Sequence, residues 1–551
     1  MSNRIIIIGS GAAGLSAALE LAKNKIESIL VSDMPSERSQ SVMAEGGINA
    51  SFTSETDSPE LHAEETRKAG RNIADAEAIL GMTKASQHII EDLFDAGMSF
   101  SLNEEGVPAV RPFGGQSVPR TYYAATNTGK QLMHTLVDQV RRYEADGTIH
   151  RMTGWVFRQL LHRENAAYGC IVTNVHTGEE QVLHGKMIIA SGGLGGMFGN
   201  ATGSVANRGT VSANLFASGV RFSNGEFIQY HPTTAPLRGK NMLISEAVRG
   251  EGGRLLVMRD GKPYYFMEDR YPERGNLMPR DVIAREEHML QREGYEIYLD
   301  MRHLDSKVRE EKLQGVMEDC RQFLGLDPET ELIPVEPGIH YFIGGIWTDR
   351  NHRTSMRNLY AAGECASQYH GANRLGGNSL LDTLYAGSVA AKSAMEDTPM
   401  TDNEPIEDDA PTLGAQNLDV NEGEKETIRD CPGSYVRKWK RMSQILRKGL
   451  CILRDEENLN QSIREIEALR AELGHETDSA AMNYENQSLR ECCLLGEMLL
   501  RSAEARKESR GAHVRSDYPE EREEFEKISL THYENGEIQI DFRKAGEEYG
   551  N

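Results

Sequence analysis

The sequence predicts an α/β protein whose main β-sheet is parallel and is built from segments far apart in the chain. Wholly apolar runs such as Ile5 to Ile8 are typical of parallel strands that are buried on both faces. These runs end in glycine-rich or serine-containing turns, GSGAAG, ASGGLGG and AAGECAS. Because the last two turns are separated by a long section, we expect that section to be an inserted α+β domain. Helical spacing after the sheet predicts a C-terminal helical bundle.

The first strand, Ile5 to Ile8, is followed by a predicted helix from Ala12 to Lys25 and a second strand from Ile26 to Asp33. The turn between strand and helix is a GxGxxG motif, in which Gly9, Gly11 and Gly14 allow a tight turn. They also allow a pyrophosphate to approach the helix N-terminus, where unpaired amides favour anions. A strand-turn-helix that binds nothing is the alternative, but this context favours a dinucleotide site. The motif places Ala12 and Ala13 at the phosphates, and Ser32 near the adenosine ribose.

Two later strand-glycine junctions extend the sheet, one at Ser191 and Gly192 and one at Gly363. The sheet therefore returns late in the chain, which suits a long, extended ligand and favours FAD over NAD. Glu364, next to Gly363, is placed where a carboxylate accepts hydrogen bonds from the ribityl hydroxyls. Each glycine pair alone could be an ordinary turn, and the prediction depends on their joint occurrence at strand ends.

Composition changes along the chain predict the domain organisation. The segment TDNEPIEDDAPTLG lacks apolar periodicity and is acidic, which indicates a linker. QSIREIEALRAEL and LRECCLLGEMLLRSAEARKE have helical spacing, whereas EIQIDFR near the C-terminus is strand-like. The predicted domains are residues 1–230 (FAD-binding domain, first part), 231–344 (capping domain for the substrate), 345–397 (FAD-binding domain, second part), 398–430 (acidic linker), 431–515 (helical domain) and 516–551 (C-terminal tail).

Net charge and cysteine spacing exclude several classes of function. With 61 basic and 84 acidic residues, the 551-residue chain has a net charge of −23, which argues against nucleic acid or anionic lipid as a direct partner. Its 7 cysteines include no CxxC pair, so we expect no iron-sulfur cluster, structural zinc or other metal. No run approaches the roughly 18 apolar residues of a membrane span. We therefore expect a soluble, cytoplasmic protein.

Seven motifs resemble, in the same order, those of the flavoprotein subunit of fumarate reductase and succinate dehydrogenase. They are RPFGGQS (Arg111 to Ser117), EFIQYHPT (Glu226 to Thr233), LISEAVRGEGG (Leu243 to Gly253), MPRDVIAR (Met278 to Arg285), HYFIGGI (His340 to Ile346), HGANRLGGNSLLD (His370 to Asp382) and ARKESRGAH (Ala505 to His513). The resemblance covers nearly the whole chain. It implies a Rossmann-like FAD-binding domain with an inserted capping domain.

The resemblance also implies a substrate pocket for a C4 dicarboxylate. Such a substrate needs cations or hydrogen-bond donors at both ends, and an acid on the face opposite the flavin. The guanidinium of Arg374 can donate two parallel hydrogen bonds to one carboxylate, and His340 is expected as a further donor to the same carboxylate. His231 and Ser245 are expected at the other carboxylate, where a twist out of conjugation makes the alkene a better hydride acceptor.

In the resembling family an arginine is the proton donor, and here it corresponds to Arg280. An arginine in water holds its proton tightly, and the family solves this with a relay, which here corresponds to Glu246 and Arg249. The alternative is that these residues form structural ion pairs, Arg280 with the adjacent Asp281 for instance, and that His231 stabilises a turn.

The stretch RSQSVMAEGG, from Arg38 to Gly47, is expected along the flavin ring. Gly46 and Gly47 let the backbone approach the ring, and Ser39 and Ser41 donate hydrogen bonds to it. Many family members have a histidine covalently bound to flavin at the position of Gln40. Since glutamine cannot form that bond, we expect non-covalent FAD, which favours fumarate reduction over succinate oxidation. Further cofactor contacts are expected in the HGANRLGGNSLLD motif, from Asn378, Ser379 and Leu380.

Some residues depart from the family pattern. The family usually has an acidic TGDG-like turn where this chain has VANRG, with Asn207 and Arg208. Lys130 replaces a common histidine. None of these positions is required for hydride or proton transfer. The segment Arg506 to His513 is expected to be structural, because in the family it packs the helical domain on the flavin domain.

The sequence therefore favours an enzyme that reduces fumarate, or a related unsaturated dicarboxylate, to succinate. A succinate-oxidising dehydrogenase and L-aspartate oxidase are the alternatives, although L-aspartate oxidases tend to have GGHS where this chain has FGGQS. A catalytically silent FAD-binding subunit is a third possibility. Because the chain carries no predicted cluster, we expect electrons to come from an iron-sulfur subunit, in a complex that a membrane anchor could complete at the cytoplasmic face. A free-standing enzyme that uses reduced flavin or another soluble donor is the alternative. The physiological direction, substrate, donor and oligomeric state stay open.

Overall fold

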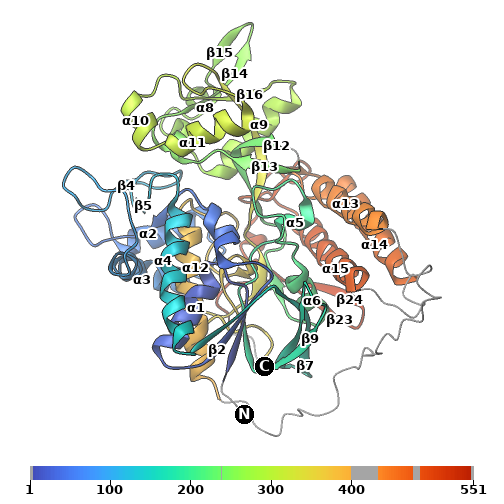
Figure 1. The fold of residues 1–551 in the computed structure, drawn as a ribbon. Coiled ribbons are helices and arrows are strands. Elements are labelled where there is room, and N and C mark those ends of the chain that lie inside the picture. The colour runs from blue at the N-terminus through green and yellow to red at the C-terminus, as the bar shows by residue number, and fades with distance from the viewer. Residues whose placement is uncertain (1–3, 238, 399–431, 476–483, 548–551) are drawn as a thin grey trace.

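A computed structural model of the chain describes residues 4–237, 239–398, 432–475 and 484–547 (Figure 1). The predicted linker, residues 398–430, lies outside the described residues apart from Thr398. The N-terminal and central segments form a large lower body, residues from about 240 to 330 form a smaller body above it, and the C-terminal helices lie against one side (Figure 1). This arrangement confirms the predicted fold class.

A five-stranded parallel sheet, in the order β19-β10-β1-β2-β6, forms the centre of the lower body. Its strands are β1 (Ile5–Ile8), β2 (Ser28–Ser32), β6 (Ile149–Thr153), β10 (Lys186–Ile189) and β19 (Leu359–Ala361). The strands predicted around each glycine turn are therefore confirmed, and they pair although they are far apart in the sequence. The helix after β1, α1 (Ala12–Lys23), ends two residues before the predicted end, with Asn24 as its C-cap.

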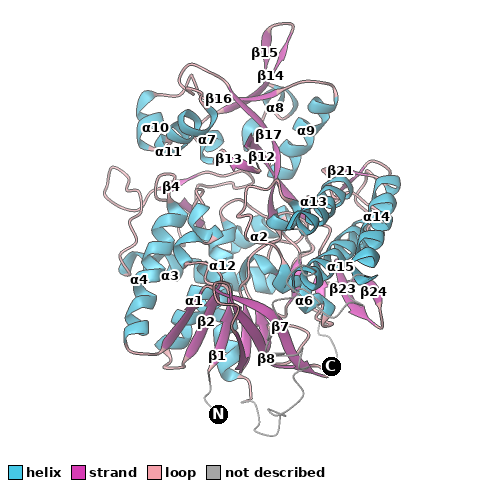
Figure 2. Ribbon diagram, turned by 45° about the vertical axis from the view of Figure 1, so that its right-hand side comes forward, coloured by secondary structure: helices cyan, strands magenta, loops and turns pink. Residues whose placement is uncertain are grey.

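Alternate residues of the first strand face two different layers. Ile5 and Ile7 pack in a core with α1, whereas Ile6 and Ile8 pack in a second core with Phe157 of an antiparallel sheet. The helical layer and this second sheet lie on opposite sides of the parallel strands (Figure 2). The helical layer consists of α1, α3 (Ala76–Asp95), α4 (Thr128–Ala145) and α12 (Asn378–Glu396). The antiparallel sheet consists of β7 (Trp155–Arg163), β8 (Ala166–Asn174) and β9 (Glu180–His184). Burial on both faces explains why the strand is wholly apolar.

The upper body is built on a six-stranded sheet with its own core (Figure 1). The strands, in spatial order, are β13 (Lys240–Leu243), β12 (Ile228–Leu237), β17 (Ile333–Phe342), β16 (Ile297–Asp300), β14 (Arg254–Arg259) and β15 (Lys262–Tyr264). Its helices are α7 (Ala247–Gly250), α8 (Phe266–Arg270), α9 (Arg280–Arg292), α10 (Ser306–Glu311) and α11 (Gln314–Asp319). The long antiparallel pair β12 and β17 connects this capping body to the lower one.

The helical side of the molecule consists of α13 (Pro432–Gly449), α14 (Glu456–His475) and α15 (Tyr484–Ala505). These helices contribute to the same core as Phe216 and Phe222 of the lower body. The strand-like EIQIDFR forms β24 (Glu537–Arg543), which pairs with β23 (Ile528–Glu534). β23 in turn pairs with β11 (Phe222–Ser223), so the C-terminal strands are joined to the lower body.

The remaining elements are short or lie at the edges. They are α2 (Pro59–Ala69), α5 (Gly195–Phe198), α6 (Thr210–Ala217), β3 (Ile48–Asn49), β4 (Val110–Arg111), β5 (Thr121–Tyr122), β11 (Phe222–Ser223), β18 (Gly345–Trp347), β20 (Ala366–Ser367), β21 (Leu453–Arg454) and β22 (Val514–Arg515).

Buried ion pairs attach the helical side to the lower body at the ARKESRGAH segment. Arg506 Nε lies 2.5 Å from Glu226 Oε1, and its Nη1 lies 2.9 Å from Glu508 Oε1. Arg454 donates to the backbone carbonyl of Glu226 at 2.7 Å. Since all four side chains are buried, they support the structural role expected for this segment.

Candidate active site

A cavity of about 590 Å³ runs from the glycine turn of the lower body to the capping body. At one end Gly9, Gly11, Ala12 and Ala13 line it, together with Ser32 at the end of β2. At the other end it is lined by the capping-body residues His231, Ser245, Glu246, Arg280 and His340. The cavity therefore joins the two predicted sites, one for a dinucleotide and one for a small acid.

The GxGxxG turn leaves no room for side chains. A Cβ on Gly9 would lie 2.2 Å from the Ala190 carbonyl oxygen, and the φ of Gly9 is +109°. A Cβ on Gly14 would lie 1.9 Å from the Gly9 oxygen. Gly14 does not line the cavity, so its role is to let α1 pack closely on β1. The chain before the helix is thereby held where its amides can meet a phosphate.

The stretch RSQSVMAEGG lines the middle of the cavity. Ser41 Oγ accepts a hydrogen bond from the first amide of α1, Ala12 N, at 3.0 Å. Ser39 Oγ is buried and has no hydrogen-bond partner among the described residues. Gln40 Oε1 accepts a hydrogen bond from Ser204 N at 2.5 Å. A free buried hydroxyl that faces a long cavity fits a flavin, whose ring atoms would supply the missing partner.

The two glycines of this stretch are also required by their surroundings. A Cβ on Gly47 would lie 2.5 Å from the Tyr122 carbonyl oxygen, and its φ is +141°. A Cβ on Gly46 would lie 3.0 Å from the Phe113 ring. Both glycines line the cavity, so they leave space beside it, as expected for backbone that approaches a ring.

Glu364 lies at the strand-end junction predicted for the ribityl chain, where Ser191 and Gly192 also line the cavity. Its Oε1 accepts a hydrogen bond from Phe342 N at 3.1 Å. Burial raises the pKa of Glu364 to about 7, although the Phe342 amide and the Arg374 charge lower it. The raised pKa makes the protonated form of this carboxyl accessible near neutral pH, so the group can donate as well as accept hydrogen bonds.

The residues that depart from the family pattern do not all face the cavity. Asn207 lines the cavity beside Gly192. Arg208 turns away instead, and its guanidinium carbon lies 5.6 Å from the ring centroid of Trp439 on α13. Lys130 is exposed on α4. The cation at the position of an expected aspartate therefore faces the helical side of the protein.

Asn378 does not reach the cavity, although Ser379 and Leu380 line it. The Asn378 side chain donates to Thr66 Oγ1 at 2.9 Å and accepts from Asn49 Nδ2 at 2.7 Å. Its oxygen also lies 2.9 Å from His62 Nε2. These contacts hold the start of α12 in place. The Asn378 side chain therefore supports the cofactor site from behind and does not line it. Sequence reasoning could not foresee this, because the partners come from α2 and β3.

The predicted substrate residues lie together at the capping end. The rings of His231 on β12 and His340 on β17 have centroids 5.0 Å apart. Arg374 lies with its guanidinium carbon 4.2 Å from the centroid of Tyr341, and its Nε has no hydrogen-bond partner among the described residues. Four groups able to donate hydrogen bonds, with Ser245 as the fourth, therefore face one space.

Burial keeps both histidines of this pocket neutral. Burial and the Arg280 charge hold the pKa of His231 well below its usual range, and they do the same for His340. Thr233 N donates to His231 Nδ1 at 3.2 Å, so the proton of the neutral His231 ring is on Nε2. His231 thus bonds the backbone that follows it and also lines the pocket. Burial and the Arg280 charge also lower the pKa of Arg374 to about 10, which leaves it cationic at neutral pH.

Arg280, Glu246 and Arg249 form a buried chain of alternating charge. Arg280 Nη2 lies 2.6 Å from Glu246 Oε2, and Arg249 Nη2 lies 3.5 Å from Glu246 Oε1. Burial alone would raise the pKa of Glu246, but the two arginine charges hold it at about 2. The predicted alternative pair does not form, because Asp281 binds Arg71 at 2.9 Å instead. Arg280 therefore reaches the cavity, while Arg249 lies behind Glu246.

Gln229 joins the two pocket arginines, and sequence reasoning missed it. Its Oε1 accepts hydrogen bonds from Arg280 Nη1 at 3.1 Å and from Arg374 Nη2 at 3.0 Å. Its amide nitrogen donates to the Arg374 carbonyl at 2.9 Å. Gln229 precedes His231 by two residues on β12, and this spacing was the signal in the sequence, since alternate strand residues share a face.

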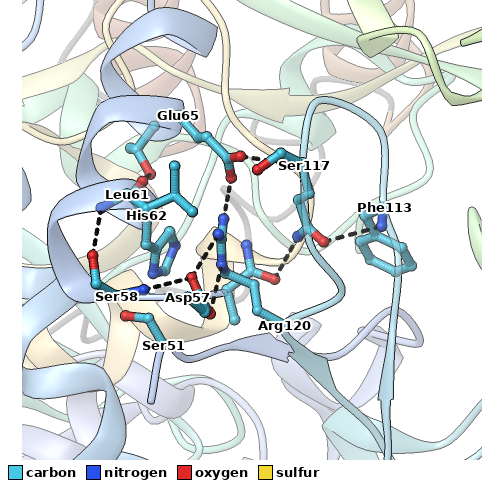
Figure 3. Close-up of polar contacts among 12 residues, drawn as sticks. Ser51, Asp57, Ser58, Leu61, His62, Glu65, Phe113, Ser117 and Arg120 are labelled. Atoms are coloured by element: carbon cyan, nitrogen blue, oxygen red, sulfur yellow. Dashed lines mark hydrogen bonds and ion pairs between the residues drawn. The ribbon is translucent and has the colours of Figure 1, made fainter. Parts of the chain in front are cut away.

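The RPFGGQS loop connects the lower body to this chain of charges. Gly114 N donates to Glu246 Oε1 at 3.0 Å, and Gln116 Oε1 accepts from Phe113 N at 3.1 Å. Ser117 N donates to Glu65 Oε1 at 2.8 Å, and Glu65 pairs with the buried Arg120 (Figure 3). The loop is therefore braced from α2, which keeps its amides directed at Glu246.

Glu45 is a second residue that sequence reasoning missed. It belongs to the stretch RSQSVMAEGG and lines the cavity, as does Ser245 of the capping body. Burial raises the pKa of Glu45 to about 8, the Asp319 charge adds to this, and a hydrogen bond with Ser245 lowers it. A carboxyl group with a raised pKa thus contacts one of the predicted substrate residues.

Neither a metal site nor a membrane-spanning helix occurs in the described part of the chain. In residues 4–237, 239–398, 432–475 and 484–547, no three His, Cys, Asp or Glu side chains come together as a metal site. Within the same ranges, no helix is both long enough and apolar enough to cross a bilayer.

The glycine turn, the long cavity and the adjoining cationic pocket define an FAD-dependent oxidoreductase. Residues 4–380 match the model of an FAD binding domain, and residues 439–548 match the C-terminal model of fumarate reductase flavoproteins. The chain belongs to the family of fumarate reductase and succinate dehydrogenase flavoproteins.

Individual relatives cover nearly the full chain. The succinate dehydrogenase flavoprotein subunit of Bacillus subtilis is 35% identical over 94% of this chain and 91% of its own length. A fumarate reductase (CoM/CoB) subunit of Methanothermobacter marburgensis is 33% identical over 96% of both chains. A solved mutant of the quinol fumarate reductase of E. coli is 28% identical, covers 100% of this chain and 98% of its own, and has a TM-score of 0.87.

Proposed function

We propose that this flavoprotein reduces fumarate, or a closely related unsaturated dicarboxylate, to succinate, and that Arg280 donates the proton. The observation that carries the proposal is the buried series Arg280, Glu246 and Arg249, which ends in the cavity beside Arg374 and two neutral histidines. FAD, when bound, would supply the hydride. The residues that would hold it are those that line the cavity from Gly9 to Glu364.

The pocket residues bind the two ends of the substrate differently. Arg374 and His340 take one carboxylate, because Arg374 is cationic and has an Nε without a partner among the described residues. His231 and Ser245 take the other carboxylate, with His231 donating from Nε2. An asymmetric pair of sites can hold one carboxylate out of the plane of the double bond, which makes the alkene a better acceptor.

Arg280 gives its proton to the carbon of the double bond that does not receive the hydride. Glu246 is ionised before the reaction, so it holds the Arg280 guanidinium in place and can accept a proton from Arg249. Arg280 then regains its proton from Glu246, so both return to their starting charges, and Arg249, which has given up a proton, must take up another to complete the cycle. Water is excluded by the burial of all three side chains, which strengthens these charge interactions.

The cofactor is proposed to be non-covalent, because Gln40 cannot form a bond to the flavin. Its oxygen is hydrogen-bonded to Ser204 N, so the side chain has a local role in the loop. Covalent attachment tends to raise the flavin potential, and its absence favours reduction of fumarate. The relatives are named for both directions, as succinate dehydrogenase and as fumarate reductase, so this inference depends on Gln40.

Electrons are proposed to come from a separate iron-sulfur subunit. Similar proteins are named as subunits, which supports an assembly for this chain as well. We place the complex in the cytoplasm, peripheral at the cytoplasmic face of a membrane if an anchor subunit completes it. A soluble donor that reduces the chain directly is the alternative.

The test uses the purified holoprotein reduced under anaerobic conditions. Fumarate is expected to reoxidise the flavin and to yield succinate, whereas L-aspartate with oxygen is expected to yield no iminoaspartate. Turnover of L-aspartate alone would overturn the proposal in favour of an L-aspartate oxidase. Turnover of neither compound would overturn it in favour of a silent subunit.

A further inference from the structure

Glu287 is a buried acid on the same helix face as Arg280. Helix α9 buries Val282 and, along one face, Arg280, Ile283, Ala284, Glu287 and Leu290. These positions have the spacing of one helix face, and Arg280 and Glu287 are two turns apart. The residues between and beyond them pack in the capping core, where Ile283 and Leu290 are inaccessible to solvent. An acidic side chain is unusual in such an apolar stripe.

Among the described residues, none donates a hydrogen bond to the Glu287 carboxyl group. The side chain is 0% exposed, and neither carboxyl oxygen has a hydrogen-bond partner there. A buried acid without partners stays protonated, because burial disfavours the ionised form. Burial accordingly raises the pKa of Glu287 well above its usual value, with the Arg249 charge as the opposing influence. Packing alone would be served better by an apolar residue of similar size.

Arg249 is the charged group whose field lowers the pKa of Glu287. It is 1% exposed, and its Nε and Nη2 have no hydrogen-bond partner in the described part of the chain. Its Nη1 donates to the Asn276 carbonyl at 2.7 Å, which fixes one side of the guanidinium. Its Nη2 lies 3.5 Å from Glu246 Oε1, and the charges of Glu246 and Glu287 both raise the pKa of Arg249 against the effect of burial. Glu287, Arg249, Glu246 and Arg280 thus form a series from the capping core to the cavity.

We propose that Glu287 is the proton reservoir of this series and recharges Arg249 in each turnover. The inference rests on the proposed function. Before reaction Glu287 is neutral, Glu246 is a carboxylate and both arginines are cations. As Arg280 protonates the substrate carbon, one proton moves from Arg249 to Glu246 and on to Arg280, and Glu287 gives its proton to Arg249. Glu287 is left as a carboxylate, which Arg249 stabilises until a proton from solvent restores the acid.

The path between Glu287 and Arg249 requires a step that brings the two side chains into hydrogen-bond contact. In the described residues no hydrogen bond joins the two side chains, so a rotation of the Glu287 carboxyl or one bridging water is needed. Glu287 is a positioning residue in this scheme, since it touches neither substrate nor flavin. Its effect must therefore appear in proton transfer and in the pH profile.

The test compares Glu287→Gln, Glu287→Leu and Glu287→Asp in the full-length holoprotein with the wild type. Glu287→Gln keeps the size but cannot give up a proton, so kcat for fumarate reduction is expected to fall about 10²-fold, the low end of general acid catalysis. KM and flavin content are expected to stay unchanged, and the solvent deuterium isotope effect on kcat is expected to increase. Glu287→Asp is expected to recover part of the rate. Glu293→Gln, an exposed acid-to-amide change just after the same helix, is the control.

Glu287→Leu separates proton transfer from packing. It is expected to unfold at no lower temperature than the wild type while it loses the same activity as Glu287→Gln. If Glu287→Gln and Glu287→Leu turn over fumarate at the wild-type rate with an unchanged isotope effect, Glu287 is only a core residue and the inference is wrong. If the wild type itself does not reduce fumarate, the proposed function fails instead, so the two failures are distinguishable.

Discussion

Arg280 and Glu246 form a buried ion pair, with Arg280 Nη2 2.6 Å and Nε 2.7 Å from Glu246 Oε2. The pair joins the cavity to Arg249 and fixes the guanidinium in one orientation. Two nitrogens on one oxygen restrict its rotation more than a single contact would. Activity should therefore depend on this pair and on the groups around it.

Replacing Arg280 should abolish most of the activity while the cofactor stays bound. Loss of a general acid costs about 10² to 10⁴ in rate. Arg280→Ala is therefore expected to lower kcat for fumarate by about that factor, measured by anaerobic flavin reoxidation, with the flavin spectrum and content unchanged. Arg285→Ala, which removes an exposed arginine from the same helix, is the control and should keep the wild-type rate. Full turnover by Arg280→Ala would remove Arg280 from the role of proton donor.

Gln229 should be needed to hold both pocket arginines. Gln229→Leu removes the shared acceptor of Arg280 and Arg374, so we expect a lower kcat and a higher KM together. Each hydrogen bond to a charged group contributes about 1.5 to 3 kcal/mol, so an effect of at least about tenfold on kcat/KM is expected. Steady-state kinetics on the purified variant measure it. An unchanged kcat/KM would show that the two arginines are held by other contacts.

Substrate binding should weaken at alkaline pH because of Glu45. Its pKa is raised to about 8, so below that pH the carboxyl is neutral and above it the carboxylate repels a dicarboxylate near Ser245. KM for fumarate is expected to rise as the pH passes upward through this pKa. Glu45→Gln should remove this rise and leave KM nearly constant over the same range. If the variant and the wild type have the same KM profile, Glu45 does not set the pH dependence.

The flavin should be released by acid. Because Gln40 cannot bond to FAD covalently, precipitation with acid is expected to leave the flavin in the supernatant, where its absorbance equals the protein-bound amount. Yellow colour in the washed pellet would contradict the prediction. Gln40→Ala, which removes the hydrogen bond with Ser204 N, is expected to bind FAD more weakly but to release it in the same way.

The Arg506 and Glu226 pair should matter for stability and not for chemistry. Arg506→Met leaves the Glu226 carboxylate buried without this partner, which costs about 3 to 5 kcal/mol in free energy of unfolding. Denaturant unfolding of the holoprotein measures this cost. Arg522→Met, which changes an exposed arginine nearby, is expected to cost much less. Equal unfolding free energies for the wild type and Arg506→Met would mean that the pair does not attach the helical domain.

The sequence predicted the parts of this molecule that depend on local patterns. The apolar run Ile5 to Ile8 and the glycine turn after it required only neighbouring residues, and both agree with the structure. The roles of Gln229 and Asn378 depend on partners that the fold brings from distant segments, so neither was foreseen. Glu287 lies seven residues after Arg280, and its helical spacing was present in the sequence, but only its burial marks it as unusual.

A single-turnover reaction of the reduced holoprotein with fumarate, followed by flavin absorbance and by succinate analysis, decides whether this cavity is a fumarate-reducing centre. We predict that each reduced flavin yields one succinate, and that Arg280→Ala slows this step by about 10² to 10⁴ while the fumarate affinity stays similar. If reduced flavin persists in the presence of excess fumarate and no succinate forms in the wild type, the cavity does not reduce fumarate and the proposed function is wrong.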